Sequence, residues 1–139
     1  MEPRTLQSRT AASGWVLRAT ATLLLIGGFG QPVFAGVYLS GDFDGLSWHV
    51  VGADLMSYLG LAQLGAALAV WIRVRRAWPF WASLGLLVGV SAQYVAGMEG
   101  ALWLHLPLGV ALIAGIAIVV AALWMRPLPR RRKEAGTDG

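Results

Sequence analysis

The chain has 139 residues, of which 57% are hydrophobic and only 13% are charged. A soluble domain of this length would have too little polar surface to cover itself. The formal net charge of +4 would suit a nucleic-acid partner, but every cation lies next to an apolar run or at a chain end, which predicts a membrane protein and no nucleic acid. The absence of cysteine excludes disulfides and covalent c-type heme.

Four apolar segments have about the 20 residues that an α-helix needs to cross the hydrocarbon of a bilayer. Helices are expected because a lone strand in lipid would leave its backbone groups unpaired. The connections are short, so consecutive spans become antiparallel neighbours. The predicted fold is all-α, an integral membrane four-helix bundle of up-down-up-down order. It comprises residues 15–39, 48–72, 80–98 and 101–125, preceded by a cytoplasmic segment 1–14 and followed by a basic cytoplasmic tail 126–139.

The first span has a second interpretation. Arg18, the apolar run after it and "PVFAG" resemble a secretory signal peptide cleaved after Ala35. We favour an uncleaved helix, because the run continues through "AGVYL" to a spanning length. The Arg18 side chain would then extend to the inner headgroups.

The basic residues are distributed unevenly over the connections. They lie before or at the start of the first span, between the second and third, and after the fourth, whereas the other two loops carry only Asp42, Asp44 and Glu99. Because basic loops stay cytoplasmic, both termini are predicted inside. We therefore expect a multi-pass protein of the bacterial cytoplasmic (inner) membrane.

The only two histidines occupy matching places in the two halves of the chain. "QPVFAG" closes the first span before His49, and "QYVAG" closes the third before His105; each histidine follows a tryptophan and precedes a glycine. This pattern predicts a parallel repeat of two helical hairpins about an axis along the membrane normal. Both imidazoles should then lie at a similar depth near the outer face.

Two imidazoles on facing helices can supply the opposite axial ligands of a b-type heme. Glycines near them leave room for a flat macrocycle, and glutamines can hydrogen-bond a propionate or orient a histidine. The candidate binding residues are the iron ligands His49 and His105 and, around them, Gly52, Met56, Gly109, Gln31 and Gln93. The third span also carries Gly85, Gly89 and Gly97 at four-residue steps. Such spacing equally suits close helix packing without any cofactor.

Asp54 is an acid inside the second span, on a different face from His49. An intramembrane acid is expected to be functional or paired. We favour a structural hydrogen bond to a neighbouring helix over proton transfer between the outer face and a heme or quinone. Two weaker interpretations are a zinc site, from both histidines with Asp54 or Glu99, and a transporter pathway through Asp54 and Gln63.

At "QPVFAG…WHVVGAD" and "QYVAG…LWLHLPLG" the chain resembles one half of the heme A synthase family, and also small four-span bacterial proteins. The resemblance, over residues 28–122, implies a four-helix bundle in which His49 and His105 match paired heme ligands. The family's catalytic acid, shortly before its first histidine, has no counterpart among Leu46, Ser47 and Trp48. Its second bundle is also missing. The resemblance therefore implies binding or electron transfer rather than synthesis.

The sequence thus predicts a membrane protein that binds heme b between His49 and His105, for electron transfer or heme handling. Enzymatic activity is left open and is not favoured. A redox partner or a membrane complex is expected besides the lipid bilayer, and a homodimer would rebuild the two-bundle arrangement. The alternative is a cofactor-free accessory or assembly subunit packed through glycine-rich helix faces.

Overall fold

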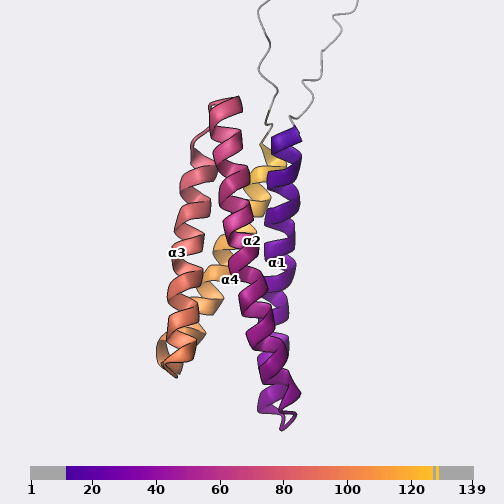
Figure 1. Cartoon of the computed structure of the whole chain (residues 1–139), viewed down its shortest axis with the longest axis vertical. Helices are drawn as coiled ribbons and strands as arrows, with labels where there is room; N and C mark the ends of the chain where they lie inside the picture. The colour runs from indigo at the N-terminus through magenta and orange to yellow at the C-terminus, as the bar shows by residue number, and fades with distance from the viewer. Residues whose placement is uncertain (1–11, 127, 129–139) are drawn as a thin grey trace, which may run out of the picture.

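The computed structural model describes residues 12–126 and 128. Over these residues the chain forms four helices: α1 (Ala12–Leu39), α2 (Asp44–Val74), α3 (Trp78–Met98) and α4 (Leu102–Met125). Each helix runs antiparallel to the next (Figure 1) and contacts it, and α4 returns to contact α1. The predicted all-α fold with four helices is confirmed, and all four are long and apolar enough to cross a membrane. The expected termini before residue 12 and after residue 128 lie outside the described residues.

The second helix begins at Asp44, earlier than the expected residue 48. Hydropathy marks the part of a helix that matches hydrocarbon, whereas the helix itself continues into the polar region. An acid in the first turn favours this extension, because the helix N-terminus carries partial positive charge. The Asp42 carboxylate also accepts the N–H of Asp44 at 3.1 Å. The α1–α2 connection is therefore shorter than expected, with Gly41 at a φ of 98° in its turn.

The other two connections are equally tight. The α2 helix ends at Arg75, whose left-handed φ of 59° turns the chain while its N–H donates to the Trp71 carbonyl at 2.9 Å. Pro79 lies in the first turn of α3, where a missing N–H costs nothing. Between α3 and α4, Gly100 has a φ of 67°, a conformation that favours glycine. Tight turns at both ends keep successive helices adjacent.

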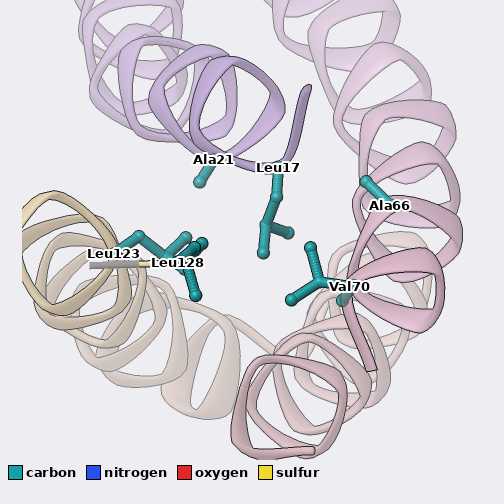
Figure 2. Close-up of a cluster of buried hydrophobic side chains, with 7 residues drawn as sticks. Leu17, Ala21, Ala66, Val70, Leu123 and Leu128 are labelled. Atoms are coloured by element: carbon teal, nitrogen blue, oxygen red, sulfur yellow. The ribbon is translucent and has the colours of Figure 1, made fainter. Parts of the chain in front are cut away.

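The core is densest at the end of the bundle where α1 begins and α4 ends. Figure 2 shows Leu17 of α1 and Val70 of α2 directed into the space between the helices, with Leu123 and Leu128 on the opposite side. The buried members of this cluster come from α1, α2 and the end of α4, and are Leu17, Ala21, Ala66, Ala67, Val70, Leu123 and Leu128. At the opposite end, the α1–α2 and α3–α4 pairs diverge (Figure 1). The packing therefore holds the bundle together at one end and opens it at the other.

Arg18 lies at this end of the bundle and reaches the end of α4, and its extension to the inner headgroups stays a prediction. The side chain is only 7% exposed. Its Nε donates to the Leu123 carbonyl at 2.9 Å and its Nη2 to the Arg126 carbonyl at 3.2 Å. The guanidinium also stacks on Trp15 and Trp124. The last carbonyls of a helix lack internal donors and favour a cation, so Arg18 fastens α1 to α4.

We expect Arg18→Met to lower the free energy of unfolding by about 2 kcal/mol, because hydrogen bonds from a charged donor to two carbonyls are lost. The exposed Arg73 on α2 provides the matched control, since its replacement by methionine removes the same charge without a buried contact. Thermal unfolding of both variants in one detergent measures the difference. Equal stability of the two variants would show that the Arg18 contacts contribute nothing.

Candidate cofactor site

His49 of α2 and His105 of α4 meet across the diagonal of the bundle, near the open end. Their ring centroids are 6.0 Å apart and their planes are inclined by 63°. The backbones of α2 and α4 make no close approach in the described helices, so the two imidazoles reach across the space between these helices. The structure thus places the only two imidazoles of the chain beside each other.

Each imidazole is oriented by a backbone carbonyl of the preceding helix. Nδ1 of His49 lies 3.1 Å from the Gln31 carbonyl oxygen, and Nδ1 of His105 lies 2.9 Å from that of Gln93. A carbonyl oxygen can only accept, so in both rings Nδ1 carries the proton and donates. The lone pair of Nε2 is then available, and this is the arrangement in which histidine ligates a metal.

The glutamine side chains repeat the same relation. The Gln31 amide lies against Gly52, at the place where a Cβ would otherwise be. The Gln93 amide lies against Gly109 in the same way, with Nε2 at 2.9 Å from the position of such a Cβ. Each half of the chain therefore carries a glutamine with two contacts on the following helix. Its backbone carbonyl lies within hydrogen-bond distance of the histidine, and its side-chain amide packs on the glycine one turn after that histidine. The glutamines that begin the motifs "QPVFAG" and "QYVAG" thus make the same contact with a histidine in both halves of the chain.

The two histidines line a cavity of about 340 Å³ between α1, α4 and the facing parts of α2 and α3. Six of the seven candidate binding residues lie in its wall, namely His49, His105, Met56, Gly109, Gln31 and Gln93. Gly52 does not line it, because the Gln31 amide covers that glycine. The rest of the wall is almost entirely apolar, and its far end is closed by residues that include Gly28, Leu112, Ile113 and Ile116. A volume of this size is within the usual range for small-molecule sites.

Two of the three glycines of α3 fit the interpretation of close helix packing, not that of room for a macrocycle. Leu112 of α4 comes within 2.6 Å of the place where a Cβ on Gly89 would lie, and the His105 ring comes within 2.9 Å of that place on Gly97. Gly85 faces open space. Gly89 and Gly97 therefore allow close packing of α3 against α4, whereas the glycines of the cavity wall are Gly28, Gly36 and Gly109.

We expect Gly52→Ala to displace the Gln31 amide and to lower stability by about 1 to 2 kcal/mol. Because the obstructing group is the end of a flexible side chain, Gln31→Ala should relieve most of this loss. Unfolding of the two single variants and the double variant in detergent gives the coupling free energy. Strict additivity would mean that the two residues do not interact.

Asp54 accepts a hydrogen bond from the Tyr94 hydroxyl of α3 at 3.0 Å. Its carboxylate lies on the outside of the bundle, whereas the Tyr94 ring lines the cavity. Gln63 is 1% exposed and contacts the Thr20 hydroxyl. Asp54 and Gln63 are about 13 Å apart along α2 and on opposite faces, so the structure does not bring them together into a polar pathway.

The zinc interpretation also lacks a ligand set. Among residues 12–126 and 128, no three histidine, cysteine or acidic side chains are grouped closely enough to hold a metal ion. A heme needs only two axial donors, because the porphyrin supplies the other four.

Three features of the site were missed in the sequence: Tyr94 and Gly28 in the cavity wall, and the two glutamine carbonyls as histidine partners. The repeat did contain a signal for the last, since a glutamine begins each "Gln…Ala-Gly" motif. Glutamine draws attention to its side chain, however, and its backbone carbonyl carries no sequence signature. Tyr94 follows Gln93 directly, and no sequence pattern distinguishes this tyrosine as a residue of the cavity wall.

Fold and site together define an all-α protein with four apolar helices and one two-histidine cavity between its helical hairpins. No family model, no curated protein and no solved structure matches the chain.

Proposed function

We propose that the protein binds one b-type heme between His49 and His105 and uses it for electron transfer or heme handling. The observation that carries this proposal is the pair of adjacent imidazoles, whose Nδ1 atoms both lie within hydrogen-bond distance of backbone carbonyls. When bound, heme supplies a redox-active iron or is itself the cargo. The residues of the chain supply two axial nitrogens, fix their tautomer and exclude water from the iron.

The spacing of the rings supports this ligand. Two iron–nitrogen bonds of about 2 Å place the nitrogens about 4 Å apart, and about 1 Å more on each side reaches the ring centres. The expected separation of about 6 Å agrees with the observed 6.0 Å. The donor set is also suitable, because neutral imidazole is an ordinary axial ligand of heme iron. The apolar wall beside the rings suits the macrocycle.

Titration of hemin into the purified chain in detergent tests the proposal. We expect a saturable Soret band at one heme per chain, which dithionite shifts to that of a reduced b-type heme. The matched control is the chain in which both histidines are replaced by alanine. A band of equal strength in the control would assign the signal to heme dissolved in detergent.

We further propose that the chain spans the bacterial cytoplasmic membrane with both termini inside. The basic α2–α3 connection and the acidic outer loops support this orientation. The chain has no native cysteine, so single cysteines report topology directly. In intact cells, Ser40→Cys should react with a membrane-impermeant maleimide, whereas Ala77→Cys should react only after permeabilisation. The reverse pattern would invert the orientation.

The likeness to one half of the heme A synthase family belongs to the same proposal. In that family a second bundle carries a second histidine pair, and a homodimer of this chain would reproduce such an arrangement. Because Leu46, Ser47 and Trp48 offer no acid before His49, we propose binding and not synthase chemistry. A redox partner or membrane complex is proposed for the electron-transfer form of this function.

A second candidate is the cofactor-free accessory subunit. It is favoured by the glycines whose open face is filled by a neighbouring side chain, such as Gly52 by Gln31 and Gly27 by Met56. Such contacts are what close packing of membrane helices requires. The cavity beside the histidines has no role in that function. A protein that stays colourless in the hemin titration would favour this candidate.

A further inference from the structure

The exposed residues of the cavity wall belong to α1 and α4. Three of its lining residues are strongly exposed on the outside of the bundle: Leu39 of α1 at 80%, Leu106 of α4 at 62% and Val110 of α4 at 70%. We call these three residues the mouth. The mouth is apolar and belongs to helices that are apolar enough to span a membrane. In a bilayer it therefore faces acyl chains.

None of the described residues that line this cavity is a lysine or an arginine. The lining residues belong to the ranges 28–56 and 90–116, and no lysine or arginine occurs between Arg18 and Arg73 or between Arg76 and Arg126. The carboxylates of a bound heme would form no ion pair in the cavity and must stay in contact with water or lipid headgroups. The apolar macrocycle of the heme, in contrast, matches the apolar wall of the cavity. A ligand held by two axial bonds and apolar contacts, without ion pairs, is one that can be released.

One buried polar atom of the wall also has no partner. Oε1 of Gln93 is shielded from solvent and forms no hydrogen bond with the described residues. A buried acceptor of this kind costs free energy until a donor reaches it. The site is therefore not fully satisfied by the chain itself.

From the apolar mouth and the missing cations we infer that the protein is a carrier, which takes up heme from the outer leaflet and returns it there through the mouth between α1 and α4. This inference rests on the proposed heme binding and selects heme handling over a permanently bound electron-transfer centre. The two histidines hold the iron, and the mouth sets the rate of exchange with the bilayer.

Exchange kinetics test the inference. The chain without heme, in nanodiscs, is mixed with phosphatidylcholine vesicles that contain hemin, and growth of the Soret band gives the loading rate. Excess apomyoglobin then gives the rate of loss. We expect Val110→Trp to slow both rates by about tenfold, because a bulky side chain narrows the mouth. The position of the final Soret band should stay unchanged, because Val110 supplies no ligand to the iron.

Val88→Trp is the matched control, because Val88 is a 62% exposed valine of α3 that does not line the cavity. Leu39→Trp, on the other side of the mouth, is a second test variant should Val110→Trp fail to fold. Wild-type rates in a folded mouth variant, or equal slowing in Val88→Trp, would overturn the lateral route and leave heme binding intact. A bound heme that apomyoglobin never removes would overturn the carrier role alone. Without a Soret band in the wild type, both the proposed function and this inference would fail.

Discussion

Replacing either His49 or His105 by alanine is expected to abolish the b-type heme spectrum of the protein. In the proposed site each ring would supply one of two axial bonds, and the chain contains no third histidine to replace it. The only other candidate donor in the cavity wall that ligates heme iron in cytochromes is Met56. In the proposed site one remaining ring would leave the iron with a single protein ligand. We expect the affinity for hemin to fall by about 100-fold or more in each variant.

Reduced-minus-oxidised spectra of membranes that contain each variant measure this loss. Tyr58→Ala is a suitable control, because it removes an aromatic side chain from α2 that is 70% exposed and does not line the cavity. It should leave the spectrum unchanged. Retention of the wild-type band by His49→Ala or by His105→Ala would exclude that histidine as an iron ligand.

The second large effect is expected at Gly45, in the first turn of α2. A Cβ at this position would lie 2.5 Å from the backbone nitrogen of Tyr38 and 2.7 Å from the carbonyl oxygen of Phe34. Both obstructing atoms belong to the α1 backbone, which cannot move aside as a side chain can. Gly45→Ala should therefore push α1 and α2 apart at the outer end and lower the free energy of unfolding by about 3 kcal/mol. Since Gln31 and His49 lie on these two helices, hemin affinity should fall as well.

Gly65→Ala, in the same helix, provides the comparison. A Cβ on Gly65 meets no atom within 4 Å, and alanine favours a helix over glycine by about 1 kcal/mol. The control should therefore unfold at the same temperature as the wild type or slightly above it. Thermal unfolding of both variants in one detergent decides the matter. Equal stability of Gly45→Ala and Gly65→Ala would contradict the close contact between Gly45 and the α1 backbone.

The helices and the pairing of the histidines were accessible from the sequence for physical reasons. Hydrocarbon thickness fixes the length of an apolar span, and short connections force neighbouring helices to be antiparallel. These two constraints bring His49 and His105 to one end of one bundle before any side chain is placed. The repeat around Gln31 and Gln93 was a second, independent indication that the two histidines lie at a similar depth along the bundle.

The partners of individual side chains were not accessible in this way. The hydrogen bonds of Arg18 to the end of α4 were not predicted, because hydropathy indicates the depth of a residue and not which carbonyls lie beside it. Gly52 was expected to leave space for a macrocycle, but the Gln31 amide fills that space. Asp54 was expected to find a partner on a neighbouring helix without any indication of which one; the structure identifies Tyr94. Contacts of this kind depend on helix rotation, which a single sequence leaves undetermined.

The central claim is that one iron atom lies between the two imidazoles. The most direct measurement is the absorption spectrum of the purified wild-type protein loaded with hemin, recorded before and after dithionite and then under carbon monoxide. The account predicts six-coordinate low-spin heme in both oxidation states and no reaction with carbon monoxide, since both axial positions are filled. A colourless protein, or a heme that binds carbon monoxide readily, would contradict it.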